Sequence, residues 1–210
     1  MPESRGSVPS AVADLAALGR LWAEHCDRLL AMLERRIDVR LRQRIDAEEV
    51  LNDAFLDASR DWAAYQRGSP MQPYAWLYQL AYDRLIEVYR RNVTGGRDLR
   101  RDLPVAGDWS AVLGGQVQDS GTGPQTAAQR AELAERMQQM LSLLSDSDHD
   151  LLAMRYFDQL STREIRDVLN ARHPDAPQVN ENALDVRLFR ALKKLHKLWQ
   201  STFGESENAQ

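Results

Sequence analysis

Apolar residues recur at helical spacing along nearly every patterned segment of this chain. Residues three and four apart share one face of a helix, so this spacing predicts amphipathic α-helices. The first predicted helix begins after Ser10, and its apolar face carries Leu15, Leu18, Trp22, Cys26, Leu29 and Leu33. No segment shows the convincing period-two alternation that is typical of a half-buried strand. The pattern therefore predicts an all-α fold.

Two more helices are predicted before residue 92. An arginine-rich connector comes first, with Arg35, Arg36, Arg40, Arg42 and Arg44. Asp46 then stands where a side chain caps a helix, with Glu49 three residues later. This helix is expected to bury Val50, Ala54, Phe55, Ala58 and Trp62. Pro73 suits the first turn of the next helix, whose apolar positions are Trp76, Leu77, Leu80, Ala81, Leu85 and Val88.

The helical pattern stops between Thr94 and Gln125. Two Gly-Gly pairs and further glycines and prolines interrupt this stretch, which is typical of a linker. Its only apolar cluster is Trp109, Val112 and Leu113. We therefore predict two small helical domains, at 10–92 and 126–200, joined by a flexible linker at 93–125 and followed by a tail at 201–210.

The predicted second domain opens with a helix that starts at Thr126. This helix is expected to bury Leu133, Met137, Met140, Leu141 and Leu144. Ser145 can cap a further helix, which would run through Leu151, Leu152 and Tyr156.

The chain then carries the pattern of a helix-turn-helix. Ser161 and Glu164 form a capping box, in which each side chain bonds the backbone of the other residue. After an irregular segment, apolar residues recur at helical spacing from Leu184 to Trp199. Other faces of that last helix carry Arg187, Arg190, Lys193, Lys194 and Lys197. A short capped helix, a turn and a longer basic helix indicate binding to duplex DNA.

The charge of the whole chain argues against a stand-alone DNA-binding protein. The 210 residues carry a net charge of −4, whereas such proteins are usually basic. Basic residues are nevertheless concentrated in two segments, 84–101 and 183–199, each with a net charge of +4. This distribution predicts DNA contacts that are weak alone and depend on a partner.

Several functional classes are disfavoured by the sequence. A single cysteine, Cys26, excludes an internal disulfide and fits a cytoplasmic protein. His25 is its neighbour, but no second cluster offers metal ligands, so we expect no metal and no cofactor. No apolar run approaches the length of a membrane span, and the first residues lack the hydrophobic region of a signal peptide. We also find no nucleophile elbow, phosphate loop or acid/base constellation, so we expect that the protein is not an enzyme.

Motifs in both predicted domains resemble the sigma-70 family, and in particular the small extracytoplasmic-function (ECF) sigma factors. The segment Ala47–Leu56 resembles the core-polymerase-binding motif of the family, and Pro73–Ala81 with Arg90-Arg91 is similar to the helix that holds the melted −10 element. Leu160–Ile165 and Arg187–Ala191 resemble its −35-binding helix-turn-helix. The two sets occur in the family's order across a linker, and their combination is more specific than either motif.

The resemblance implies partners and site residues. Core RNA polymerase would bind Glu48, Glu49, Asn52 and Asp53. The −10 element would contact Trp76, Asp83, Arg84, Glu87, Arg90 and Arg91. The −35 element would contact Asn182, Asp185, Arg187, Arg190, Lys193 and Lys194. Membership also implies control by an anti-sigma factor. By spacing, Trp76 looks mostly like a core residue, although an aromatic side chain beside a basic stripe can receive an unstacked base.

The chain departs from the family pattern at several of these positions. Asp83 stands where Asn is common, Glu87 replaces the usual Asp, and Asp185 occupies an often basic position. Arg166 replaces a small alanine and must either reach out of the helix interface or widen the helix crossing. Asn170 replaces the turn glycine as a residue that tolerates the left-handed conformation. The turn 171–179 is about eight residues longer than usual in the family. Asn180 can still cap the last helix. We expect the fold to tolerate the longer turn and −35 recognition to differ.

Two other classes of function are weighed against a sigma factor. A conventional helix-turn-helix regulator would bind a duplex operator without polymerase, which the modest basic charge disfavours. A helical adaptor would carry the same charged residues as solvated surface. Neither explains why the motifs that resemble polymerase-binding and melting helices precede the helix-turn-helix.

Overall fold

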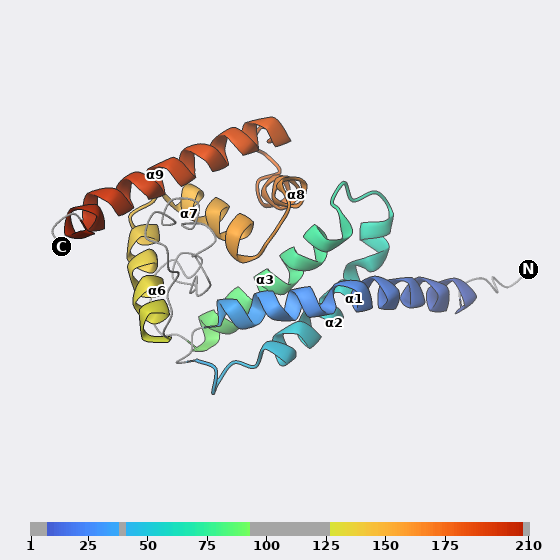
Figure 1. The fold of residues 1–210 in the computed structure, drawn as a ribbon. Helices are drawn as coiled ribbons and strands as arrows, with labels where there is room; N and C mark the ends of the chain where they lie inside the picture. The colour runs from blue at the N-terminus through green and yellow to red at the C-terminus, as the bar shows by residue number, and fades with distance from the viewer. Residues whose placement is uncertain (1–7, 38–40, 93–126, 208–210) are drawn as a thin grey trace, which may run out of the picture.

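The computed structural model describes residues 8–37, 41–92 and 127–207. Within these ranges the ordered elements are helical, which confirms the predicted all-α fold (Figure 1). The N-terminal half, as we call it, consists of α1 (Val8–Arg36), α2 (Ala47–Gln66) and α3 (Pro73–Asn92). The C-terminal half consists of α6 (Ala127–Ser142), α7 (Asp146–Leu152), η2 (Ala153–Phe157), α8 (Thr162–Arg172) and α9 (Glu181–Glu207).

The N-terminal half is a three-helix bundle in which α2 and α3 pack against α1 and against each other. Asp46 caps α2, and its carboxylate accepts a hydrogen bond of 2.8 Å from the Glu48 backbone N–H. Most of the predicted apolar positions are buried, but Leu15 is 57% exposed, so the prediction of a core role for it is wrong. The helix period is correct there, and the N-terminal end of α1 projects beyond the other helices (Figure 1).

The C-terminal half is built around α9. Helices α6, α7 and α8 all contact it, and Leu184, Leu188, Ala191 and Leu195 supply its buried face. Ser145 caps α7 through the Asp148 backbone N–H, as predicted. The helix that begins there becomes a π-helical turn, η2, before it ends at Asp158. Gln159 follows with a positive φ of 56°, which turns the chain into α8.

The two halves are docked on one another. Helix α8 lies against α3, and buried residues of both halves belong to one continuous apolar core. The division into domains at the predicted boundaries stays a prediction, and residues 93–126, with Trp109 and its apolar neighbours, lie outside the described residues.

Two local expectations need correction. The sequence pattern places Arg35 and Arg36 in a connector, but both belong to the last turn of α1, and Arg36 is 2% exposed. Asn170 was expected at a turn with left-handed backbone, but it lies inside α8, which continues to Arg172. The long turn therefore begins only at His173, which is the C-cap of α8. The last turn of α8 contacts α3, where Arg172 donates to Gln79 at 2.9 Å.

Candidate polymerase and nucleic-acid interfaces

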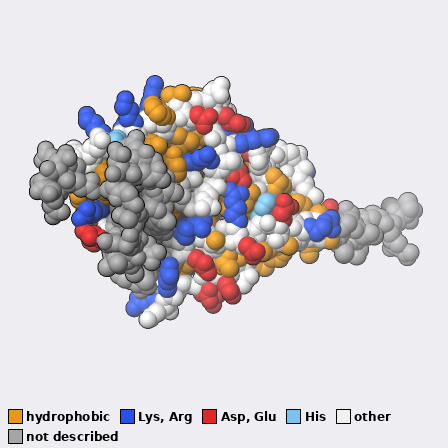
Figure 2. Space-filling view, viewed as in Figure 1, with side chains coloured by type: hydrophobic (Ala, Val, Ile, Leu, Met, Phe, Trp, Pro, Cys, Tyr) orange, Lys and Arg blue, Asp and Glu red, His pale blue; other side chains and the backbone are white. Residues whose placement is uncertain are grey.

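The first turns of α2 present an acidic and amide surface to solvent. Glu48, Glu49 and Asn52 are exposed and Asp53 is half-buried, while Val50 and Ala54 point into the core. Leu56, one turn further, is 52% exposed. Acidic side chains gather near the lower edge of the molecule, where α2 begins (Figure 2). The four predicted polymerase-binding residues thus lie together at the start of one helix.

The solvent-facing side of α3 carries charged side chains that pair with one another. Arg84 forms ion pairs with Asp57 of α2 and with Glu87, and Glu87 also binds Arg91. Asp83 accepts a hydrogen bond of 2.6 Å from Gln79. Arg90 at the end of the helix is exposed. The predicted −10 residues apart from Trp76 are therefore brought together on one face, but their charges are largely balanced.

A cavity of about 270 Å³ lies between α2 and α3 on this face. Its charged lining residues are Asp57, Arg60, Asp61, Asp83, Arg84 and Glu87, four carboxylates and two guanidinium groups. A net negative lining repels phosphate groups. Contact with a nucleic-acid strand on this face would therefore favour bases that donate hydrogen bonds.

Trp76 is held inside the N-terminal half and is 8% exposed. Its ring stacks on Tyr65 with the ring centroids 4.2 Å apart, and Trp62 lies 5.9 Å away. The cluster joins α2 to α3. In this conformation Trp76 is a packing residue, and its contact with an unstacked base stays a prediction.

Helix α9 presents a row of basic side chains at the surface. Arg190, Lys193 and Lys194 are exposed and Arg187 is half-buried. Lys and Arg side chains line the upper edge of the molecule, along which α9 runs (Figure 2). Two apolar residues between them are also exposed, Val186 at 48% and Phe189 at 68%. Asn180 caps the helix through the Ala183 N–H at 2.8 Å, as predicted.

Two of the predicted −35 residues are engaged in contacts within the C-terminal half. Asp185 accepts a hydrogen bond of 3.0 Å from Thr162 at the start of α8. Lys194 forms an ion pair of 2.6 Å with Asp148 of α7. Burial opposes ionisation of Asp148, but its contacts with Lys194 and Ser145 outweigh this effect and lower the pKa of the carboxyl. Asn182, by contrast, is exposed in the first turn of α9.

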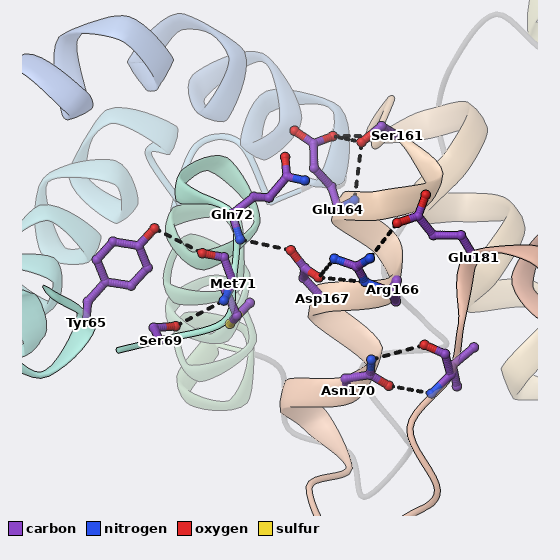
Figure 3. A network of polar contacts seen from close by, with 11 residues as sticks. Tyr65, Ser69, Met71, Gln72, Ser161, Glu164, Arg166, Asp167, Asn170 and Glu181 are labelled. Carbon is purple, nitrogen blue, oxygen red and sulfur yellow. Dashed lines mark hydrogen bonds and ion pairs between the residues drawn. The ribbon is translucent and has the colours of Figure 1, made fainter. Parts of the chain in front are cut away.

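Polar side chains hold the helix-turn-helix in shape (Figure 3). The capping box of Ser161 and Glu164 is formed in both directions. The Arg166 side chain is 25% exposed and forms ion pairs with Asp167 and with Glu181 at the start of α9, so it bridges α8 and α9. Which of the two predicted solutions it adopts stays a prediction. Asn170 closes the long turn by a pair of hydrogen bonds with the Val179 backbone, at 2.8 and 3.2 Å.

The contacts between the two halves were missed by the sequence analysis. Arg36 of α1 forms an ion pair of 2.6 Å with Asp158, and Arg28 forms one of 2.9 Å with Glu164. The partners lie more than a hundred positions apart in the sequence, so no local sequence pattern predicts these ion pairs. Only the capping box singled out Glu164, for a different reason.

The described part of the chain holds no group of three or more His, Cys, Asp or Glu side chains arranged to bind a metal ion. Among its helices, none combines the length and the apolar character that crossing a bilayer requires.

The chain is similar to two known proteins. Among curated proteins, the chain is 27% identical over 125 residues to the ECF RNA polymerase sigma factor SigW of Bacillus subtilis (strain 168). The match covers 60% of this chain and 64% of that protein, which is less than two thirds of its length. Among solved structures, the chain is similar to CnrH in complex with the cytosolic domain of CnrY, with a TM-score of 0.49 and 18% identity over 91% of this chain and 93% of that one.

A family model described as "ECF sigma factor" matches residues 11–174, which include α2, α3 and α8. This match spans well over half of the chain, and the chain belongs to the ECF sigma factor family.

Proposed function

We propose that this chain binds core RNA polymerase and directs it to specific promoters. The start of α2 binds polymerase through Glu48, Glu49, Asn52 and Asp53. The exposed face of α3 contacts the −10 element, and α9 contacts the −35 element through Arg187, Arg190 and Lys193. The chain acts in the cytoplasm as a binding protein and catalyses no reaction itself, and an anti-sigma factor is its expected regulator.

The observation that carries this proposal is the separation of an acidic and a basic surface on one chain. Carboxylates at the start of α2 are exposed on the N-terminal half, whereas the exposed cations of α9 lie on the C-terminal half. An acidic helix face suits a basic or amide-rich protein partner, and a basic helix of a helix-turn-helix suits the DNA backbone and base edges. A protein that bridges polymerase and promoter needs both surfaces at once.

Core binding is tested first by co-elution of the purified chain with sigma-free bacterial core polymerase. We expect a stable complex with the wild-type chain and its loss in Glu49→Arg/Asp53→Arg, because reversed charges repel the same partner surface. The matched control is Glu24→Arg/Asp175→Arg, which reverses two exposed carboxylates that do not belong to α2. Absence of a complex, with salt-sensitive binding to duplex DNA alone, would instead identify an operator-binding regulator.

A further inference from the structure

We propose that the docked arrangement is a self-inhibited state, in which Asp158, Glu164, Asp167 and Arg172 of the C-terminal half hold the N-terminal half and must release it before a promoter is bound. We call these four residues the clamp. The inference rests on the proposed function, because it concerns the simultaneous use of the −10 and −35 surfaces.

Asp158 makes the most buried contact of the clamp. Its carboxylate accepts hydrogen bonds of 2.9 and 2.6 Å from the Arg36 guanidinium and one of 2.7 Å from the Tyr78 hydroxyl. The side chains of Arg36 and Asp158 are 3% and 0% exposed. Each charge is tolerated in the interior only because the other is present. When the halves separate, both return to water, so this contact can reverse without leaving an unpaired buried charge.

Glu164 makes the second contact, at the start of α8. Arg28 donates to both of its carboxylate oxygens, at 2.9 and 3.1 Å, and also to the Gln159 carbonyl at 2.6 Å. The Arg28 guanidinium lies over the Tyr74 ring, 3.5 Å from its centroid. Because Glu164 also closes the capping box, the same carboxylate begins α8 and holds it on α1.

Asp167 and Arg172 fasten α8 along α3. The Asp167 carboxylate accepts a hydrogen bond of 2.9 Å from the Gln72 backbone N–H, immediately before the first residue of α3 (Figure 3). A carboxylate from the opposite half thus occupies the positive end of that helix. Farther along, Arg172 donates to Gln79 at 2.9 Å and lies 4.7 Å from the Tyr82 ring centroid. The contacts extend along α3 from its first turn to Tyr82.

The closed arrangement is too small to contact both promoter elements. Elements centred at −35 and −10 lie about 25 base pairs apart, which is roughly 85 Å of duplex at about 3.4 Å per pair. A compact chain of this length has a radius of gyration of about 17 Å and is about 45 Å across. The segment 93–126 joins the halves and has enough residues to reach on the order of 110 Å when extended. Promoter binding therefore requires the halves to separate.

The clamp leaves the individual surfaces accessible. Glu48, Glu49 and Asn52 on α2 and Arg190 and Lys193 on α9 are exposed while α8 is docked. The closed state therefore blocks the combined use of the surfaces rather than either one alone. We expect core polymerase to bind α2 first and the pair of promoter elements to complete the opening.

The first experiment measures energy transfer between dyes in the full chain. Cysteines replace Glu24 on α1 and Lys197 on α9 in a Cys26→Ser background. We expect high transfer in the free chain and low transfer with core polymerase and a promoter. Asp158→Asn and Glu164→Gln are expected to lower the transfer of the free chain. Arg172→Ala, which removes a half-exposed anchor at the end of α8, tests the same point if Asp158→Asn fails to fold.

The control for these variants is Asp148→Asn, which removes an ion pair within the C-terminal half and is expected to leave the transfer unchanged. Transfer that is equally low in the free and promoter-bound chain would overturn the proposal. So would release variants that fold normally and keep the wild-type transfer.

The second experiment locks the clamp. Gln72→Cys and Asp167→Cys, in the Cys26→Ser background, are oxidised to a disulfide, or joined by a short bismaleimide if direct oxidation fails. We expect the locked chain to lose promoter-directed initiation by at least tenfold and the uncrosslinked double variant to retain it. Equal initiation by both forms would overturn the proposal. Failure of the uncrosslinked chain to bind core would reject the proposed function instead, and the energy transfer of the free chain would still decide whether the clamp holds the halves together.

Discussion

At the scale of single residues, the carboxylate of Asp158 makes the most buried ion pair between the two halves. It is fully buried and is satisfied by Arg36 and Tyr78, which come from two different helices of the other half. Burial and the negative charge of Asp158 raise the pKa of Tyr78, so the phenol stays protonated as a donor. A buried ion pair contributes little over a well-packed apolar pair, but removal of one partner is costly.

Asp158→Asn is therefore expected to destabilise the docked arrangement by up to about 3–5 kcal/mol, because in that arrangement it leaves the Arg36 charge buried without a counter-ion. Separation of the halves returns Arg36 to water and limits this loss. Urea denaturation of the full chain measures this loss. The control is Arg36→Met/Asp158→Asn, which removes both charges and keeps an acceptor for Tyr78. If the double variant is as unstable as the single one, the unpaired charge is not the cause.

Glu164 makes the stability of the fold depend on pH in the acidic range. Burial opposes ionisation of its carboxyl, but hydrogen bonds from Arg28 and Ser161 outweigh burial and lower its pKa below the ordinary value of 4.5. A group with a lowered pKa contributes stability above its ordinary pKa and loses it as the pH falls through the folded value. We expect the urea concentration at the unfolding midpoint to decrease as the pH is lowered below about 4.5. Glu164→Gln should make that decrease shallower. An equally steep decrease at acidic pH in this variant would contradict the assignment to Glu164.

At the scale of elements, helix α9 carries two kinds of cation, those without an ion pair in the described part of the chain and one that is paired within the C-terminal half. No ion pair within the described part of the chain engages Arg190 or Lys193, whereas Lys194 is paired with Asp148. Exposed cations that neutralise phosphates release counterions, which makes binding salt-dependent. The same helix also supplies the buried face of the C-terminal half.

Arg190→Ala and Lys193→Ala are each expected to weaken binding to a −35 duplex and to lower the slope of log affinity against log salt by about 1 if the side chain contacts phosphate. Lys194→Ala should lower the slope less, because its ammonium group is already paired. Fluorescence anisotropy over a salt series measures all three. An equal change of slope in the three variants would show that the Asp148 pair does not persist on DNA.

At the scale of the whole molecule, the two surfaces to which we assign different partners lie on opposite halves. The acidic start of α2 and the basic face of α9 belong to separate groups of helices, which contact each other mainly through α3 and α8. Their functions should therefore be separable by mutation, since residues on distant surfaces without shared partners act nearly independently.

We expect Glu49→Arg/Asp53→Arg to abolish co-elution with core polymerase while the free chain keeps its affinity for a −35 duplex. Arg190→Ala/Lys193→Ala should do the reverse, with core binding retained and promoter-directed initiation reduced. Co-elution, anisotropy and a transcription assay on the same preparations provide the comparison. Loss of both activities in both variants would indicate that the two surfaces act as one site.

The sequence by itself determined the helices and most of their boundaries. Asp46, Ser145 and Ser161 cap the helices for which they were predicted, and Leu18, Leu29 and Leu33 lie in the core. These features depend on neighbours within one or two turns, which the sequence displays directly. The motifs of the family also lie on helices that the apolar period defines, so the candidate site residues could be proposed from the sequence, and their roles stay predictions.

Only the tertiary structure decided how the two halves meet. Arg28 and Glu164 are 136 positions apart, and Arg36 and Asp158 are 122 apart. A helix period identifies which face is buried but not which residue of a distant segment covers it. For the same reason it placed Leu15 in the core and Arg36 in a connector, although the structure exposes the first and buries the second. The buried charges are stable only in their three-dimensional pairing, and a one-dimensional pattern does not contain that pairing.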